Sequence, residues 1–215
     1  MQRAYGLSIP ETLEEVCDPA RMALLVYDMQ VGILGQIPDA TALTANVVRV
    51  LDAARRAGVR VLFSRHLSLP RELMGVFQMR MAMAWQRVGS VDDVHPWFLR
   101  GTPGMEITSE VAPLDREAVF DKITMSAFEG TWLDIALRDC GVTAVAVVGA
   151  AIEVGIEPTV RHAADLGYIP VVVTDACGAG NRDAAERSLA GLHFTGDAVF
   201  TDTDSLCGLL SAPGR

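Results

Sequence analysis

Three residues of this sequence have types and positions suited to hydrolytic chemistry: Asp28, Lys122 and Gly155. Asp28 ends an apolar stretch, and a carboxylate at such a position can accept or donate a proton. Lys122 can bind a substrate carboxylate or stabilise the aspartate. Gly155 lies at a predicted helix start, where the missing side chain leaves room for substrate or water and leaves backbone amides accessible to an anion. The simpler alternatives are a turn-capping aspartate, a surface ion pair and a packing glycine.

The elements that position these residues follow from an alternation of short β-branched stretches with longer segments of helical periodicity. That pattern is typical of βαβ units and a parallel sheet. Six strands are predicted, each apolar throughout as strands covered on both faces must be: Met22 to Tyr27, Val59 to Ser64, Ala118 to Asp121, Ala144 to Val148, Ile169 to Thr174 and Ala198 to Thr201. Helices are predicted over Ala42 to Ala57, Trp132 to Arg138, Val154 to Leu166 and Asp183 to His193.

We therefore expect an α/β fold, a single three-layer doubly wound domain over residues 1–215, with a six-stranded parallel sheet flanked by helices and residues 1–20 as a lead-in. Open sheets of this kind bind ligands beyond the carboxyl ends of their strands. Asp28 follows the first predicted strand, Lys122 the third and Gly155 the fourth. The three are expected to meet in one crevice.

Composition narrows the class of protein. The chain has 215 residues, 50% of them hydrophobic, and a net charge of -9. Such a surface repels nucleic acid and anionic membranes. No apolar stretch reaches the roughly 18 residues of a membrane span. We expect a cytoplasmic protein with a small-molecule substrate. The four cysteines lack metal-ligand spacing and are expected to be buried, reduced thiols.

Several segments carry a family resemblance: Leu24 to Gln30, Arg100 to Gly104, Lys122 with Ser126-Ala127-Phe128, and Glu157 to Ala163. In this order they resemble the isochorismatase-like hydrolase family. In its thiol members an aspartate and a lysine flank a nucleophilic cysteine, and Asp28 and Lys122 match the first two. Gly155 stands at the cysteine position, and Ile152-Glu153 replaces the Thr-Asp pair often found there. Thiolate chemistry is thereby removed.

The resemblance leaves three functions open. Isochorismatases proper also carry glycine at this position and cleave a vinyl ether, so Asp28 is expected to act as general acid with Lys122 as its electrostatic partner and water as nucleophile. The lack of an arginine in Ile123-Thr124-Met125 weighs against binding of a dicarboxylate. The second function is amide or ureide hydrolysis by activated water. The third is an inactive paralogue that binds a ligand or assembles with other subunits.

Further substrate contacts are expected from His66, Ile152, Glu153, Phe128 and Trp97. His66 follows the second predicted strand, and Glu153 is either a helix-dipole partner or a second acid or base. A cofactor and a metal site are not expected, since one histidine is too few ligands in this neighbourhood.

The methionine-rich stretch 74–85 is predicted to pack on a neighbouring subunit or the core, or to form a lid. Homo-oligomers, dimers or tetramers, are common in the resembling family. The resemblance also suggests a cis peptide near Gly149 to Ile152.

Overall fold

The computed structural model describes residues 1–212 and is built around a parallel six-stranded sheet with the order β5-β4-β3-β6-β7-β8. The strands are β3 (Met22–Tyr27), β4 (Arg60–His66), β5 (Ala118–Lys122), β6 (Ala144–Ala150), β7 (Ile169–Gly178) and β8 (Val199–Thr201). The chain order reverses between β3 and β6, which pair from Met22 with Ala144 to Tyr27 with Gly149. A reversal of this kind opens a crevice at the carboxyl ends of the two strands.

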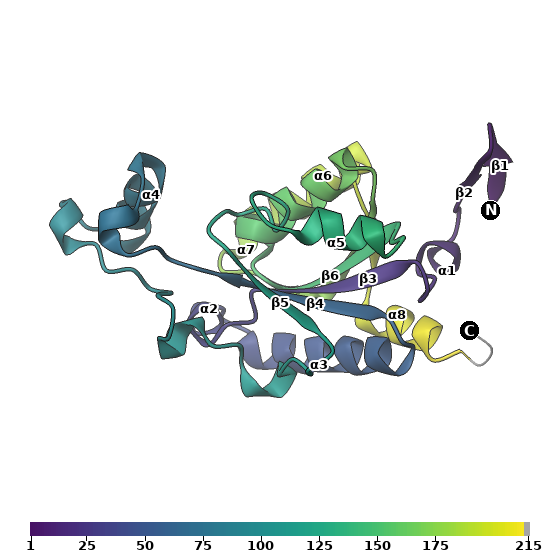
Figure 1. Cartoon of the computed structure of the whole chain (residues 1–215), viewed down its shortest axis with the longest axis horizontal. Coiled ribbons are helices and arrows are strands. Elements are labelled where there is room, and N and C mark those ends of the chain that lie inside the picture. The colour runs from purple at the N-terminus through teal and green to yellow at the C-terminus, as the bar shows by residue number, and fades with distance from the viewer. Residues whose placement is uncertain (213–215) are drawn as a thin grey trace.

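Helices cover both faces of the sheet and complete three layers (Figure 1). One face is covered by α3 (Ala40–Arg56) and α8 (Thr203–Leu210), and the other by α5 (Leu133–Asp139), α6 (Glu157–Asp165) and α7 (Arg182–Thr195). Each face has its own apolar cluster. Leu24 and Val26 belong to the first and Leu25 and Tyr27 to the second, because side chains alternate along a strand.

Two segments extend away from the sheet at opposite ends of the long axis (Figure 1). At one end is an antiparallel hairpin of β1 (Gln2–Ala4) and β2 (Leu7–Ile9), followed by α1 (Leu13–Val16). At the other is α4 (Val76–Gln86), which contains no buried residue. The remaining short elements are α2 (Val31–Leu34), η1 (Arg71–Leu73), η2 (Val91–Asp93), η3 (Pro103–Met105), η4 (Ser109–Val111) and the π-helical turn η5 (Ile152–Ile156).

The predicted fold class and all six predicted strands are confirmed, with three corrections. First, β5 and β8 are edge strands and only partly buried, so the expectation of strands buried throughout is wrong for them. Second, Cys140 is exposed and Cys207 half-buried, whereas only Cys17 and Cys177 are buried. Third, the predicted helix from Val154 is a π-helical turn followed by α6.

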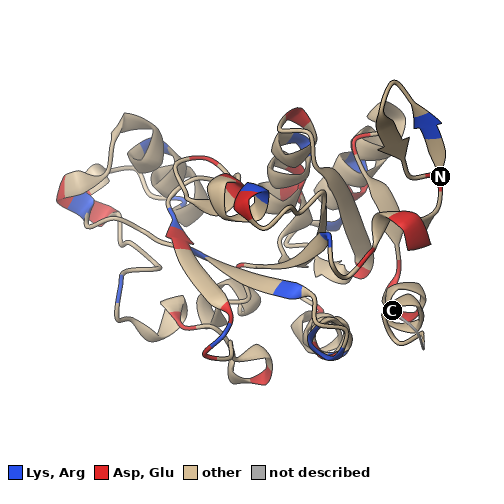
Figure 2. Cartoon of the chain, turned by 45° about the vertical axis from the view of Figure 1, so that its right-hand side comes forward, with Lys and Arg blue, Asp and Glu red and all other residues tan. Residues whose placement is uncertain are grey.

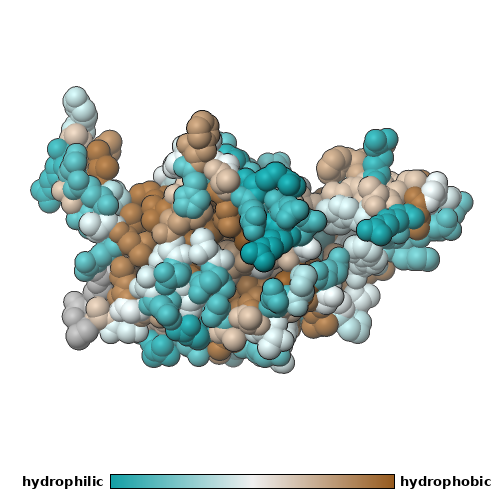
Figure 3. All heavy atoms as spheres, turned by 180° about the vertical axis from the view of Figure 1, so that it is seen from behind, coloured by the Kyte–Doolittle hydropathy of each residue, from teal (hydrophilic) through white to brown (hydrophobic). Residues whose placement is uncertain are grey.

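Acidic and basic residues are interspersed along the chain (Figure 2). On the face shown in Figure 3, hydrophobic side chains gather on the body beside the N-terminal hairpin. Within residues 1–212, no helix is long and apolar enough to cross a bilayer.

Candidate functional site

A buried ion pair lies at the carboxyl ends of β3 and β5. The Nζ of Lys122 lies 2.7 Å from Oδ2 of Asp28, and the two side chains are 1% and 5% exposed. Burial lowers the pKa of Lys122, and the charge of Asp28 together with its hydrogen bond opposes that shift. Lys122 also donates to the carbonyl of Thr124 at 3.2 Å and lies 4.4 Å from the ring centroid of Tyr27. The ammonium is thus enclosed by one anion, one carbonyl and one aromatic ring.

Asp28 is fixed by its backbone as well as by its side chain. Its φ of 46° lies in the left-handed region, which costs a non-glycine residue free energy and is concentrated at functional sites. The hydroxyl of Ser64, in β4, donates to Oδ1 at 2.6 Å, and the Asp28 amide donates to the Ser64 carbonyl at 3.2 Å. Both carboxylate oxygens therefore accept a hydrogen bond, which fixes the orientation of the carboxylate.

The ring of Tyr27 fills the space where a side chain at position 155 would lie. A Cβ added to Gly155 would overlap the Tyr27 hydroxyl and lie 2.5 Å from Cζ. The hydroxyl donates to the carbonyl of Met125, and burial followed by the charge of Asp28 raises the tyrosine's pKa well above its ordinary value. The phenol therefore stays protonated. Gly155 is thus required by the tyrosine ring that precedes Asp28.

A cavity of about 480 Å³, here called the large cavity, opens at this end of the sheet. Its volume suits a small organic ligand. The part of its wall that comes from the strand ends and the turn after β6 includes Tyr27, Asp28, His66, Glu153 and Gly155. Trp85, Arg87, Trp97 and Phe98 line it from the side of α4 and the segment that follows. Lys122 is absent from the lining and acts on the cavity through Asp28.

His66 projects into this region as a neutral ring. Burial, and then the charge of Lys122, lower its pKa to about 4. Its backbone is held by the side chain of Gln30, which accepts from the His66 amide at 2.6 Å and donates to the His66 carbonyl at 3.0 Å. The ring meets Phe98 edge-on, with centroids 5.8 Å apart. At neutral pH, His66 therefore offers one N–H donor and one acceptor nitrogen.

Glu153 stands in the π-helical turn between β6 and α6. Its Oε1 accepts hydrogen bonds from the amides of Gly180 at 2.8 Å and Asn181 at 2.6 Å, at the start of α7. The same turn follows a cis peptide between Ala150 and Ala151, inside the predicted range. The carboxylate is therefore held by α7 on one side and lines the large cavity on the other.

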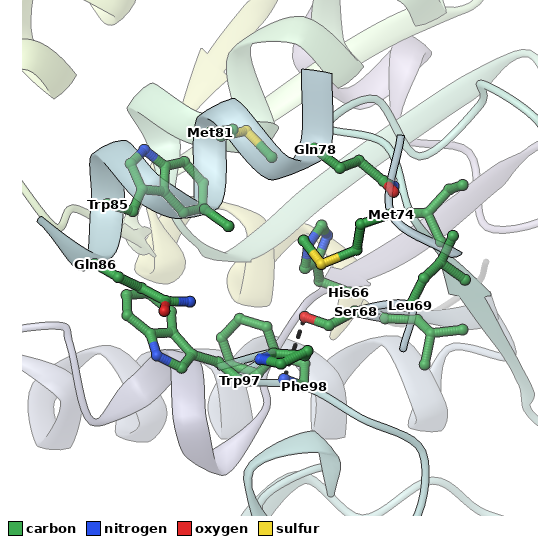
Figure 4. A pocket seen from close by; sticks show the side chains of 14 residues that line it. His66, Ser68, Leu69, Met74, Gln78, Met81, Trp85, Gln86, Trp97 and Phe98 are labelled. Atoms are coloured by element: carbon green, nitrogen blue, oxygen red, sulfur yellow. Dashed lines mark hydrogen bonds between the residues drawn. The ribbon is translucent and has the colours of Figure 1, made fainter. Parts of the chain in front are cut away.

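A second, smaller cavity of about 50 Å³ separates α4 from the strand ends. In Figure 4, Met81 and Trp85 of α4 face His66, Trp97 and Phe98 across it. The amide of Phe98 donates to the Ser68 hydroxyl at 3.3 Å, which ties the segment carrying Trp97 to the end of β4. His66, Trp85, Trp97 and Phe98 border both cavities, so α4 forms an outer wall of the site.

The structure brings together most of the residues expected from the sequence, but not all of them. Asp28, His66, Trp97, Glu153 and Gly155 line the large cavity, with Lys122 directly behind Asp28. Ile152 and Phe128 line neither cavity, contrary to expectation. Both are buried in the apolar cluster beneath α5, α6 and α7, since the π-helical turn points Ile152 inward and Phe128 stacks on Tyr168.

Other candidate groups take no part in this site. Cys177 is buried, its Sγ contacts the Val147 carbonyl at 3.4 Å, and burial raises its pKa strongly. Such a thiol is not ionised and is a poor nucleophile. Among residues 1–212, no three histidine, cysteine, aspartate or glutamate side chains are grouped so as to hold a metal ion.

Sequence reasoning missed Tyr27, Ser64 and Trp85. The signal for Tyr27 was an aromatic residue ending an otherwise aliphatic strand, on the face opposite Val26. Ser64 ends the second predicted strand, and pairing of Val26 with Phe63 brings it beside Asp28. Trp85 lies in the methionine-rich stretch 74–85, for which a lid was one predicted alternative, although it was not itself among the expected substrate contacts.

Comparison with known proteins gives three findings. The isochorismatase domain model matches residues 22–205. The ureidoacrylate amidohydrolase RutB of Serratia proteamaculans is 29% identical over 229 residues, covering 99% of this chain and 92% of that protein, and nicotinamidase 3 of Arabidopsis thaliana is 33% identical over 186 residues, covering 86% of each. A cysteine hydrolase structure from Pseudomonas syringae pv. phaseolicola 1448A has a TM-score of 0.78 at 24% identity, covering 91% of this chain and 94% of that one. The last comparison supports the fold described above.

Proposed function

The chain belongs to the isochorismatase family of hydrolases, and on that premise we propose that it hydrolyses an amide or ureide C–N bond with water, rather than a side-chain thiol, as nucleophile. Two of its relatives are named as an amidohydrolase and a nicotinamidase. The substrate is a small molecule of a size that the 480 Å³ cavity admits.

The overlap of Tyr27 with the space beside Gly155 is the observation that carries this proposal. A protein that had merely lost its nucleophile would leave an empty pocket at that position. Here an aromatic side chain fills it, while the Asp28–Lys122 ion pair is kept although it is costly to bury. The charged pair thus retains a use that does not depend on a thiol.

In the proposed reaction, Asp28 accepts a proton from water as the water oxygen attacks the carbonyl carbon. The carbonyl π electrons move to its oxygen and form a tetrahedral oxyanion. Collapse of that intermediate breaks the C–N bond, and Asp28 returns its proton to the departing nitrogen. The products are an acid and an amine, so one water is consumed and Asp28 ends as it began.

Two neighbours support these steps. Lys122 remains an ammonium that stabilises the carboxylate between proton transfers, as a positioning residue behind Asp28. His66, neutral near pH 7, can donate its N–H to the oxyanion from the cavity wall. Neither group has to change its protonation state during turnover.

Vinyl ether hydrolysis is the second candidate reaction. It is suggested by Gly155, because the isochorismatases that this chain resembles also carry glycine at this position. That reaction begins with proton donation by Asp28, whereas both oxygens of Asp28 accept hydrogen bonds in the resting site. It also needs groups for the substrate's carboxylates, and Lys122, the buried cation behind Asp28 in the described part of the chain, is already paired with that aspartate. The arrangement therefore supports C–N hydrolysis better.

The experiment is product detection by mass spectrometry from small carboxamides, ureides and isochorismate, with wild type, Asp28→Asn and an exposed-charge control, Glu186→Gln, in parallel. We expect amide or ureide turnover by wild type and the control, and a loss of at least about 100-fold in Asp28→Asn. Turnover of isochorismate alone would establish the second candidate. Absence of turnover with all three classes would indicate an inactive paralogue.

A further inference from the structure

Glu153 is held in place more firmly than a solvent-exposed glutamate. Two backbone amides donate to one and the same oxygen, Oε1, at 2.8 and 2.6 Å. Those amides belong to Gly180 and Asn181, and the Asn181 side chain caps α7. The carboxylate is therefore tied to the beginning of a helix and stays on the cavity wall, two residues from Gly155.

The second oxygen of Glu153 is unusual. Oε2 is buried and receives no hydrogen bond from residues 1–212, and no other buried side-chain nitrogen or oxygen in that range shares this condition. Leaving a buried acceptor without a donor is unfavourable, and such atoms in native proteins call for an explanation. No lysine or arginine of the described residues forms an ion pair with this carboxylate.

Glu153 determines the net charge of the inner part of the large cavity. The lining of this cavity contains five titratable side chains, namely Tyr27, Asp28, His66, Arg87 and Glu153, of which Tyr27 stays protonated because burial raises its pKa. Asp28 is neutralised by Lys122, and His66 is neutral near pH 7. Arg87 is exposed and belongs to the end of α4. Among the described lining residues, Glu153 is thus the carboxylate without an ion-pair partner, and its charge attracts cations and repels anions.

We propose that Glu153 selects the substrate by charge. The large cavity accepts amides that carry a cationic nitrogen at the end away from the reacting bond, and it rejects amides that carry a carboxylate there. This inference rests on the proposed amide hydrolysis for the identity of the reacting bond. The recognition itself rests only on Glu153 and its surroundings. Arg87 is exposed, so water screens its guanidinium and weakens its opposing effect on a charged ligand.

The test uses three amides that differ only at the far end: 4-aminobutanamide, butanamide and succinamate, which are a cation, a neutral molecule and an anion near pH 7. Dissociation constants are measured by NMR titration for wild type, Glu153→Gln and Glu186→Gln. Glutamine keeps the oxygen that accepts the two α7 amides. Glu186 is 63% exposed on α7, so its substitution removes the same charge from the surface.

We expect wild type and Glu186→Gln to bind 4-aminobutanamide at least about tenfold more tightly than butanamide, and succinamate most weakly. In Glu153→Gln the cation should bind within about twofold of butanamide, and succinamate should bind more tightly than before. Butanamide binding should be unchanged. A loss of butanamide turnover without a change in its binding would instead make Glu153 an acid or base, and succinamate binding as tightly as the cation would overturn the inference.

If no amide binds to wild type, the proposed function fails while the charge preference is still measured with butylammonium and butyrate. Preferential binding of butylammonium that disappears in Glu153→Gln supports the inference independently. Equal or absent binding of the two ions overturns it.

Discussion

At the residue scale, the buried Asp28–Lys122 pair has the clearest expected effect on the free energy of unfolding. Removing one member leaves the other buried without a counter-charge, which costs roughly 3–5 kcal/mol of the free energy of unfolding. We expect this cost for Asp28→Asn and for Lys122→Met alone, and a much smaller one for the double variant. Urea denaturation of all four proteins measures it. Additive losses in the double variant would show that the two charges do not interact as the 2.7 Å distance implies.

The overlap between Tyr27 and position 155 leads to a second prediction. Gly155→Cys alone should destabilise the protein by about 1–3 kcal/mol through overpacking, and its introduced thiol should react slowly with iodoacetamide. Combined with Tyr27→Val, the same thiol gains space beside Lys122 and should react faster, with an apparent pKa below that of a free thiol.

Alkylation rates against pH, measured in a Cys140→Ser background to remove the exposed native thiol, make the comparison. Tyr27→Val with Gly155→Ala is the matched control without a thiol. Equal reactivity of the single and double cysteine variants would mean that the tyrosine does not obstruct the position.

His66 gives a pH dependence whose sign follows from its lowered pKa. The unfolded chain binds a proton near pH 6.5 and the folded protein near pH 4, so the stabilising contribution is complete above 6.5. It is lost as the pH falls from 6.5 to 4, and the loss amounts to at most about 3 kcal/mol. His66→Gln should therefore lose less stability over this range than wild type in urea denaturation at each pH. Parallel curves would contradict the lowered pKa.

At the scale of elements, α4 is expected to bind substrate without supporting the fold. None of its residues is buried, yet Trp85 borders both cavities. Trp85→Ala should raise KM about tenfold and leave kcat within twofold, because the contact is made equally in the ground and transition states. Steady-state kinetics test this, with Arg80→Ala on the same helix as the control that lines neither cavity. A fall in kcat at constant KM would contradict it.

Part of the fold and of the candidate site could be predicted from the sequence. The central strands were predictable because β3 and β6 are buried on both faces and read as continuous apolar stretches. Asp28, Lys122 and Gly155 could be placed near one another because parallel strands bring their carboxyl ends to one edge.

What the sequence could not provide was packing that depends on distant partners. The inward turn of Ile152 depends on a π-helical geometry. The Tyr27 contact with Gly155 joins residues 128 positions apart. None of the residues of α4 is buried, so no buried apolar face predicts where this helix lies.

At the scale of the whole molecule, the projecting α4 segment predicts self-association. Leu73, Val76 and Phe77 are 67%, 81% and 73% exposed, which is unfavourable for large apolar side chains in water. We expect a dimer or tetramer at micromolar concentration in light scattering. Phe77→Glu should shift the protein towards the monomer, whereas Phe194→Glu, at a site 92% exposed on α7, should leave the assembly unchanged. A wild-type monomer under these conditions would refute the prediction.

The overlap between Tyr27 and position 155 also constrains the order in which substitutions can accumulate. A cysteine at position 155 is overpacked while the aromatic ring is present, and loss of the ring alone leaves a hole in the packing beneath Lys122. Either substitution made alone, the cysteine at position 155 or the loss of the Tyr27 ring, therefore lowers the stability of the protein. With both Tyr27 and Gly155 in place, a return to a thiol at position 155 therefore requires two substitutions together, although the Asp28–Lys122 pair is unchanged.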